Sequence, residues 1–508
     1  MNSTNPQNAN YGYQLAACLI VAGALRFGLL DAQSLWFDEG TTLELVSAPD
    51  FAAFLDRLII PVSSERLTPA YFFLAYGWGK IFGIGDFALR ALPALLGTAG
   101  VLILALAVRP VASRQYSVLV AAFGATSSYW IFYSQEARPY ALALMMVALI
   151  FFVFIREIKA PDVAKGRIVI FAVISGIAIL TSVFSALLLA ALGAADLIIR
   201  RRPSRWIAFW APAGLLSVAV FLAWMLQFEV GASAAVPKSG NFIYNLLFVP
   251  YGLLFGQTLG PPIAELRGDD KVAVALAYSP YLLLSLVSLF LVVASAAKIQ
   301  RAQRFPNSET LAAAKIILLA AVISFGGAAI LAYGIALNWL PRHAFFLEPV
   351  LIMLLPLALA APAGSVQGSQ KMTLLGRAAC GLFIGLNLFS LSNYYFDTAY
   401  ARDDYKAAAA YLRTEVKSGD TVALLYGKSE LLKHYGVSGV LNLHHVAAEE
   451  LGQALLTEAG KSQISYLVLN RSFYWHGGAS VRDSLGEDFE IGPVQRFSYI
   501  DVYKVRAR

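Results

Sequence analysis

The sequence has little charge and almost no cysteine. Asp, Glu, Lys and Arg make up only 14% of its 508 residues. This excludes an ordinary soluble globular protein, in which about a quarter of the residues are charged. The two cysteines, Cys18 and Cys380, both lie in apolar stretches, so no disulfide framework is indicated. No Lys or Arg precedes the first apolar stretch and no small-residue cleavage site follows it, so we expect it to remain as a helix.

Apolar residues are abundant. They make up 58% of the chain, and the mean hydropathy is +0.64, as in a protein that crosses a membrane several times. A helix needs about 20 apolar residues to cross roughly 30 Å of hydrocarbon. We therefore predict a mainly α, polytopic transmembrane protein with about eleven spans. They are expected at residues 13–30, 87–108, 117–134, 139–155, 167–185, 186–199, 206–226, 273–297, 311–335, 344–362 and 373–395.

The basic residues fall in alternate loops and thereby predict the orientation. One set of loops holds Arg109 and Arg114; Arg156, Lys159, Lys165 and Arg167; Arg200, Arg201, Arg202 and Arg205; Lys298, Arg301 and Arg304; Lys371 and Arg377. By the positive-inside rule these loops and the N-terminus are cytoplasmic, in the inner (plasma) membrane. The loops 31–67, 135–138, 227–272 and 338–343 and the C-terminal tail are then extracytoplasmic. The net charge of +7 reflects this topology and contact with anionic membrane lipids, and it requires no nucleic acid.

The composition predicts two parts. Residues 1–398 form the membrane module, in which Thr68–Gly83 is apolar but interrupted by Pro and Gly and is expected to lie in the membrane interface. Residues 399–508 are richer in charge and predict a small extracytoplasmic α/β domain. Its expected elements are helices at 403–417 and 447–458 and strands at 421–425 and 464–469. The pair His444-His445 is interpreted as surface histidines in preference to a metal site, because adjacent side chains on a strand point apart.

Two adjacent carboxylates, Asp38 and Glu39, follow the first predicted span directly. A carboxylate near an apolar boundary gains basicity from desolvation and can act as a general base, a metal ligand or a hydrogen-bond acceptor. The alternative is an acidic turn that caps the next helix through Asp38 or Thr41. Both interpretations stay open on this dipeptide alone.

Two further polar segments are predicted on the same side of the membrane. Ser134–Tyr140 places Glu136 and Arg138 just before a span, and Trp339–His343 places Arg342 before another. The planar guanidinium fork suits a phosphate, and a helix N-terminus also attracts anions. Each Arg could instead snorkel from a helix end. Three such segments on one face favour a functional site.

The chain resembles the GT-C glycosyltransferases in four motifs. They are Trp36-Phe37-Asp38-Glu39; Thr68-Pro69-Ala70-Tyr71-Phe72; Ala88-Leu89-Arg90-Ala91-Leu92-Pro93; and Tyr133-Ser134-Gln135-Glu136-Ala137-Arg138-Pro139-Tyr140. The resemblance is to the branch with protein O-mannosyltransferases, the lipid A aminoarabinose transferase and rhizobial galacturonosyltransferases. It is specific over residues 30–200. The chain departs from the family pattern at Leu67-Thr68-Pro69, where the family often has His-Pro-Pro, and at Thr181-Ser182, where it often has Thr-His.

This resemblance implies an enzyme that modifies lipopolysaccharide, another glycan or a protein of the cell envelope. Such an enzyme takes a sugar from a polyprenyl-phosphate carrier and inverts the anomeric centre. Asp38 matches the catalytic first-loop Asp, with Glu39 beside it, and Glu136 and Arg138 match the second-loop pair. Arg342, His343 and Tyr71 complete the expected substrate-binding residues. A divalent metal ion is not required, but Glu39 and Glu136 could bind one through oxygen.

Two other classes of protein are alternatives to the enzyme. A transporter or flippase of lipid-linked sugars should concentrate ionisable residues near the bilayer midplane, and often contains internal repeats. No such repeat is visible, and the predicted charges gather at one face. A catalytically inactive scaffold with the tail as a binding module would not need Asp38.

Overall fold

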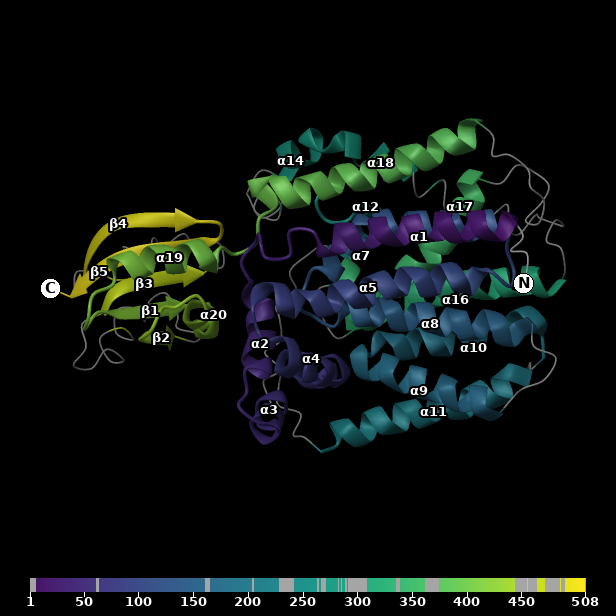
Figure 1. The fold of residues 1–508 in the computed structure, drawn as a ribbon, viewed down its shortest axis with the longest axis horizontal. Coiled ribbons are helices and arrows are strands. Elements are labelled where there is room, and N and C mark those ends of the chain that lie inside the picture. Colours follow the sequence, from purple (N-terminus) through teal and green to yellow (C-terminus); the bar gives the residue numbers. More distant parts are fainter. Residues whose placement is uncertain are drawn as a thin grey trace.

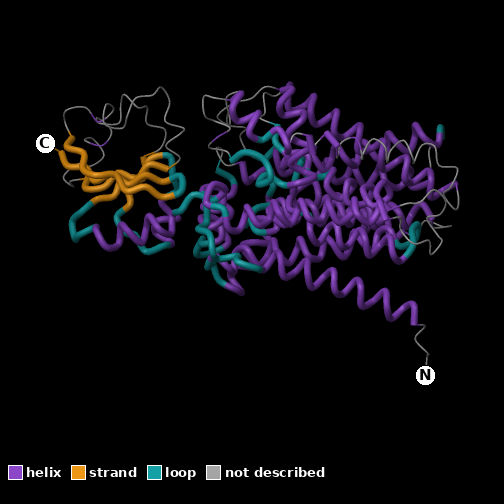
Figure 2. Tube along the Cα trace, turned by 90° about the horizontal axis from the view of Figure 1, so that it is seen from above, coloured by secondary structure: helices purple, strands orange, loops and turns teal. Residues whose placement is uncertain are grey.

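The computed structural model describes most of the chain as a helical bundle with a strand-rich region at one end (Figures 1 and 2). The described residues are 6–60, 64–159, 165–202, 205–227, 242–262, 271–281, 308–334, 339–360, 374–443, 464–470 and 489–507, with isolated residues between some of these ranges. The predicted class, a mainly helical protein with a C-terminal α/β region, is confirmed.

Long helices coincide with ten of the eleven predicted spans. They are α1 (Pro6–Phe27), α5 (Asp86–Val108), α6 (Arg114–Thr126) with α7 (Ser128–Ser134), α8 (Tyr140–Lys159), α9 (Lys165–Thr181), α10 (Phe184–Arg200), α11 (Arg205–Met225), α16 (Ser308–Gly334), α17 (Leu347–Ala360) and α18 (Leu374–Phe396). Most of the span predicted at 273–297 lies outside the described residues, and α14 (Lys271–Ala277) overlaps its start.

Among the described helices, three are long and apolar enough to cross a membrane by length and composition, namely Asp86–Val108, Tyr140–Glu157 and Thr310–Gly334. Shorter apolar helices accompany them at Gly166–Thr181, Gly214–Met225 and Leu347–Pro356. These helices indicate a multi-pass membrane protein. The number of spans and the orientation stay predictions.

The span predicted at 117–134 is two helices, because the chain leaves α6 at Ser127 and restarts as α7. Helix ends leave backbone carbonyls without partners, and inside a protein those carbonyls need donors. The buried Arg26 of α1 supplies them, donating from Nη2 to the Gly124 carbonyl at 2.9 Å and from Nη1 to the Ala125 carbonyl at 3.3 Å. Its Nε also donates to the Ser134 hydroxyl at 3.2 Å. Arg26 thus fixes α6 and α7 against α1.

Short helices cover the end of the bundle that faces the strands. They are α2 (Phe37–Val46), α3 (Phe51–Leu58), η1 (Ser64–Leu67) and α4 (Pro69–Phe82). In chain order, α12 (Phe242–Phe255) lies between α11 and α14. The helix predicted over Thr68–Gly83 is confirmed as α4. It packs closely on α2, since a Cβ atom on Gly79 would clash with Val46 Cγ1.

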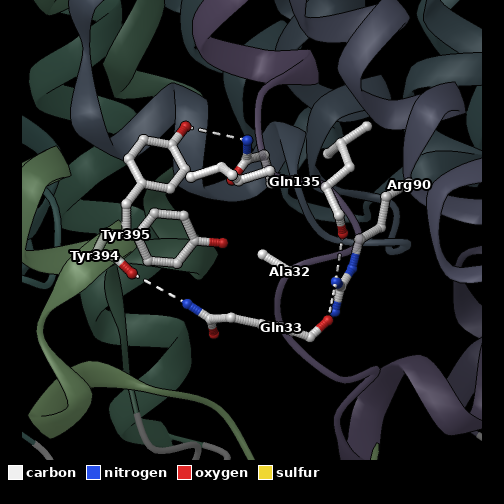
Figure 3. Close-up of a pocket in the computed structure, with 8 residues that line it drawn as sticks. Ala32, Gln33, Arg90, Gln135, Tyr394 and Tyr395 are labelled. Carbon is white, nitrogen blue, oxygen red and sulfur yellow. Dashed lines mark hydrogen bonds between the residues drawn. The ribbon is translucent and has the colours of Figure 1, made fainter.

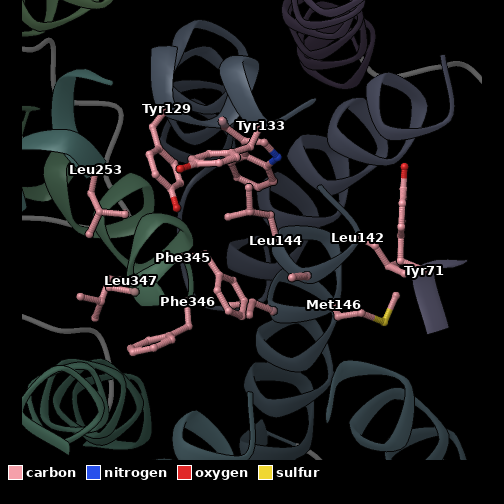
Figure 4. Close-up of a cluster of buried hydrophobic side chains, with 14 of the residues drawn as sticks. Tyr71, Tyr129, Tyr133, Leu142, Leu144, Met146, Leu253, Phe345, Phe346 and Leu347 are labelled. Carbon is pink, nitrogen blue, oxygen red and sulfur yellow. The ribbon is translucent and has the colours of Figure 1, made fainter. Parts of the chain in front are cut away.

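A cluster of buried, mostly aromatic side chains packs inside the bundle next to this end. Tyr129 and Tyr133 of α7, Leu144 of α8, and Phe345 and Phe346 just before α17 belong to one apolar cluster (Figure 4). Their packing fixes the ends of α7 and α17, and the polar segments described below start from those ends.

The C-terminal α/β region (residues 405–507) contains α19 (Tyr405–Glu415), β1 (Thr421–Leu425), α20 (Ser429–His434), β2 (Val440–Leu443), β3 (Ile464–Asn470), β4 (Phe489–Phe497) and β5 (Ile500–Ala507). The sheet order is β2-β1-β3-β5-β4; β1 is parallel to β2 and β3, and β5 is antiparallel to β3 and β4. The first predicted helix and both predicted strands are confirmed. The helix predicted at 447–458 and the pair His444-His445 lie largely outside the described residues.

Candidate active site

Four polar segments meet where the short helices join the C-terminal α/β region. They are the N-terminus of α2, the loop between α7 and α8, the turn η2 (Pro341–Ala344), and the linker of residues 401–404 between η3 (Thr398–Tyr400) and α19. The first three were predicted from the sequence to share one face, and their side chains are in contact. The fourth was not predicted.

Glu39 is fully buried and forms a two-pronged ion pair with Arg90 of α5. Arg90 Nε donates to Oε1 at 2.8 Å and Nη2 donates to Oε2 at 2.5 Å. The other Arg90 donors go to the carbonyls of Leu30, Gln33 and Ser34. All five N–H groups of this guanidinium are therefore used. Burial alone would raise the pKa of Glu39, but the charge and hydrogen bonds of Arg90 outweigh it and hold the pKa below its usual value.

Helix α2 also holds the loop between α7 and α8. The backbone N–H of Ala137 donates to Glu39 Oε1 at 2.9 Å, and its carbonyl accepts from the Thr42 hydroxyl at 2.7 Å. Glu39 and Thr42 are three residues apart and so lie on one face of the helix. The two site loops are thereby joined at Ala137, between Glu136 and Arg138.

Asp38 differs from its neighbour because its carboxylate is accessible. Its side chain is 26% exposed, and its one described ion-pair contact is a long one, 3.8 Å from Oδ2 to Nη1 of Arg342, whose side chain is 35% exposed. Its backbone carbonyl is held by Arg138 Nη1 at 3.1 Å. The position of Asp38 is therefore fixed through the backbone, and its carboxylate oxygens can accept a proton or a hydrogen bond.

Arg138 forms hydrogen bonds through only one nitrogen of its guanidinium group, Nη1. Its Nη1 donates to Asp38 and, at 2.9 Å, to Oε1 of Glu65 in η1. Among the described residues, its buried Nε has no hydrogen-bond partner, and no bond from Nη2 is formed. The edge formed by Nε and Nη2 is the one that binds a carboxylate or a phosphate through two parallel bonds.

Glu136 is almost fully buried and only partly neutralised. Its Oε1 lies 3.4 Å from Nη2 of Arg402, and its Oε2 has no hydrogen-bond partner among the described residues. Burial raises the pKa of Glu136 to about 7, with Glu39 and Asp38 adding to the shift and Arg402 and Arg342 opposing it. This carboxyl group changes charge near neutral pH.

Tyr71 and His343 were also predicted to bind substrate. The Tyr71 hydroxyl of α4 is buried and has no hydrogen-bond partner in the described part of the chain. His343 Nδ1 accepts the backbone N–H of Leu340 at 3.1 Å, which closes the η2 turn. Burial and the charge of Arg342 lower the pKa of His343 to about 3, so the ring is neutral and carries its proton on Nε2. His343 shapes the turn that presents Arg342.

Two residues of the site were missed at the sequence level. Arg90 was noted only within a motif, although a charged residue inside an apolar run is itself a signal. Arg402 was assigned to the separate tail domain. A pocket beside them is lined by Leu29, Leu30, Ala32, Gln33, Arg90, Gln135, Tyr394 and Tyr395, and the Tyr394 hydroxyl that accepts from Arg402 points into it (Figure 3).

The geometry does not fit a divalent cation held by Glu39 and Glu136. Both oxygens of Glu39 accept hydrogen bonds from Arg90, and Arg402 occupies the space between the two carboxylates. No group of three or more His, Cys, Asp or Glu side chains suited to a metal occurs within the described ranges.

No protein-family model matches the chain, and no curated protein matches its sequence. Solved structures do match. ArnT from Cupriavidus metallidurans in the apo state is 14% identical to this chain, with a TM-score of 0.51. The match covers 97% of this chain and 98% of ArnT. A second match is the archaeal oligosaccharyltransferase AglB from Archaeoglobus fulgidus, in complex with an inhibitory peptide and a dolichol-phosphate. It is 13% identical, the match covers 92% of this chain and 70% of AglB, and the TM-score is 0.51.

A further structure of the Archaeoglobus fulgidus oligosaccharyltransferase, in complex with Zn and sulfate, is 13% identical and covers 90% of this chain and 68% of its own, with a TM-score of 0.50. The chain therefore has the fold of the GT-C glycosyltransferases over nearly its whole length. The fold-level resemblance stated from the motifs is confirmed.

Proposed function

We propose that this chain, with its GT-C fold, is a membrane glycosyltransferase that moves a sugar from a polyprenyl-phosphate carrier to an acceptor hydroxyl on the extracytoplasmic face. The AglB structure that shares the fold holds a dolichol-phosphate, which supports a lipid phosphate as the leaving group. The observation that carries the proposal is the accessible Asp38 carboxylate beside two incompletely used guanidinium groups, Arg138 and Arg342. The acceptor is a lipid, a glycan or a protein.

Arg138 and Arg342 bind the phosphate of the donor in this proposal. The Nε and Nη2 edge of Arg138 offers two parallel donors, and Arg342 is free to exchange its 3.8 Å contact with Asp38 for a phosphate oxygen. These cations neutralise the charge that grows on the phosphate as it leaves. Fixed donors of this kind are each worth about 3–4 kcal/mol in the transition state.

Asp38 is the general base. Its carboxylate takes the proton of the acceptor hydroxyl while the hydroxyl oxygen bonds to the anomeric carbon, and the bond from that carbon to the phosphate oxygen breaks. The oxygen enters on the face opposite the leaving phosphate, so the anomeric configuration inverts. Asp38 suits this task because it is fixed by its backbone and its oxygens are accessible.

Glu39 has a different role from the one interpreted from the sequence. Its oxygens are occupied by Arg90 and the Ala137 N–H, so it positions the first loop against the second and takes no proton from the substrate. Glu136 and Tyr71 remain as donors and acceptors toward bound sugar, through the unpartnered Oε2 and the unpartnered hydroxyl. We assign the reacting groups to the membrane module, residues 1–398, with residues 399–508 on the extracytoplasmic side.

The test is donor consumption by the purified full-length protein in proteoliposomes. A panel of polyprenyl-phosphate-linked sugars is supplied with envelope lipids and glycans as acceptors, and release of polyprenyl phosphate is measured together with the anomeric configuration of the product. The proposal requires consumption of one donor with inversion. A flippase would move the lipid-linked sugar between leaflets without consuming it, and that result would replace the proposal.

A further inference from the structure

We infer that Arg402 is a positioning residue of the active site, and that the linker to the C-terminal α/β region completes the site from outside the helical bundle. This rests on the proposed function only in taking the cluster around Asp38 and Glu136 as the active site. The C-terminal region is then a working part of the catalytic centre and not an appended binding module.

Arg402 lies between the two buried carboxylates. Its Nη1 is 3.4 Å from Glu39 Oε2 and its Nη2 is 3.4 Å from Glu136 Oε1. The guanidinium also donates to the Tyr394 hydroxyl at 3.0 Å, and its side chain is only 7% exposed. Its carbon centre lies 5.9 Å from the Trp36 ring and 5.2 Å from the Phe132 ring. Aromatic faces stabilise a buried cation, so Arg402 is held at this point.

The next residue of the linker holds the helix that carries Asp38. Asp403 Oδ2 accepts the backbone N–H of Phe37, the first residue of α2, at 3.4 Å. A carboxylate at a helix N-terminus satisfies an unpaired N–H group and complements the helix dipole. The Arg402 N–H in turn donates to Gln33 Oε1 at 3.2 Å. The linker therefore contacts the first loop on both sides of Leu35.

The C-terminal region is fixed by a second set of contacts. Asp86, at the start of α5, accepts from His434 Nε2 and from the Tyr435 hydroxyl, both at 2.9 Å. The Tyr435 hydroxyl accepts the backbone N–H of Leu35 at 2.8 Å. Lys428 Nζ lies 3.4 Å from Glu44 Oε2 of α2. These contacts hold the strand-rich region on α2 and α5, which keeps the linker in place.

The charge of Arg402 is matched to Glu136. The other charged groups that face Glu136 are Glu39 and Asp38 of α2 and Arg342 of η2, and the facing tyrosines are Tyr71, Tyr129, Tyr133, Tyr140 and Tyr394. Among these, only Arg402 forms an ion pair with Glu136 within the described residues. Arg402 opposes the burial that raises the pKa of Glu136. Without this cation, an ionised Glu136 would be buried without its ion-pair partner.

A double-mutant cycle on the full-length protein tests this pairing without any substrate. Thermal unfolding in nanodiscs is compared for wild type, Arg402→Gln, Arg402→Lys, Glu136→Gln and the Arg402→Gln/Glu136→Gln pair. Arg402→Gln should lower the unfolding midpoint, and the loss should be clearly smaller when Glu136 is already Gln. Arg402→Lys keeps the charge and should recover most of the midpoint. Arg413→Gln, at an exposed position of α19, is the matched charge control and should change little.

The pH dependence of the unfolding midpoint distinguishes this electrostatic role of Arg402 from a merely structural one. In wild type, folding raises the pKa of Glu136 from about 4.5 to about 7. The stability of the folded protein should therefore fall as pH rises through this range, and Glu136 should cause no further fall above pH 7. In Arg402→Gln the pKa of Glu136 should rise again, so the decline should continue above pH 7. This contribution of Glu136 to the decline in stability should be absent in both variants that carry Glu136→Gln. Equal losses in both backgrounds, or no continued decline, would overturn the inference.

Sugar transfer provides the second arm. Arg402→Gln should slow turnover strongly and Arg402→Lys should restore much of it, because the position of Asp38 depends on the docked linker. If wild type consumes no donor, the proposed function fails while the unfolding cycle still decides the role of Arg402. If wild type is active and Arg402→Gln transfers sugar at the wild-type rate, the positioning role is wrong.

Discussion

The two halves of the active site use the same residue types in opposite ways. In the half around Glu39 and Arg90, both carboxylate oxygens and all five guanidinium N–H groups are hydrogen-bonded and buried. In the half around Asp38, Arg138 and Arg342, contacts are long or use only part of the side chain. The saturated half holds the loops in place, and the unsaturated half has atoms left for substrate. Adjacent carboxylates, Asp38 and Glu39, therefore have different tasks.

The largest effect on activity is expected from the unsaturated half. Asp38→Asn keeps the size of the side chain and removes its basicity, so turnover should fall by about two to four orders of magnitude. Donor binding and the unfolding midpoint should stay near wild type. Asp56→Asn, an exposed carboxylate on α3, is the matched control for the assay. Near wild-type turnover of a folded Asp38→Asn protein would contradict the role of base.

The largest effect on stability is expected from the saturated half. Glu39→Gln leaves Arg90 buried without its counter-charge, which should cost about 3–5 kcal/mol of unfolding free energy. Unfolding of the full-length protein by heat or denaturant in detergent measures it, with Asp38→Asn as the comparison. If Glu39→Gln is as stable as wild type and as inactive as Asp38→Asn, then Glu39 takes part in the chemistry.

A smaller effect, on phosphate binding, is expected when position 138 keeps its positive charge and loses the two parallel N–H donors of the guanidinium. Arg138→Lys should weaken binding of undecaprenyl phosphate about tenfold, the worth of roughly one charge-assisted hydrogen bond. Binding of undecaprenol, which has no phosphate, should be unchanged. Arg413→Lys on the exposed face of α19 serves as the control. Equal affinity of wild type and Arg138→Lys for the phosphate would assign Arg138 to holding Glu65 and Asp38 alone.

The least perturbing test concerns which side of the membrane the site occupies. With Cys18 and Cys380 replaced, single cysteines at the exposed positions Ser47 and Ser418 should react with an impermeant thiol reagent in intact cells. A cysteine at the exposed Gln115, at the other end of the bundle, should react only after lysis. The reverse pattern would place the active site in the cytoplasm.

The sequence was most informative where composition alone sets the structure. Apolar length predicted the helices, and the convergence of Asp38, Glu136 and Arg342 followed from the alternation of basic loops. It was least informative where pairing decides a role. Adjacent residues of a helix point about 100° apart, so the sequence of Asp38-Glu39 does not say which one faces Arg90.

Long-range partners explain the other failures. Arg402 contacts residues more than 250 positions earlier in the chain, across what the composition marked as a domain boundary. The break at Ser127 depends on Arg26, about a hundred residues away. Nothing local distinguishes such residues, and only packing brings their partners together.

The ties from α1 to α7 determine how the site responds to the lipid around it. Arg26 binds both sides of the break at Ser127, and the Gln135 amide nitrogen lies within hydrogen-bond distance of the carbonyls of Leu25, Arg26 and Gly28 around the end of α1. Membrane helices tilt to match the thickness of the bilayer. Because both loop-bearing helices are fixed at one level, such a tilt moves the first and second loops together. The reacting groups should therefore keep their spacing in membranes of different thickness.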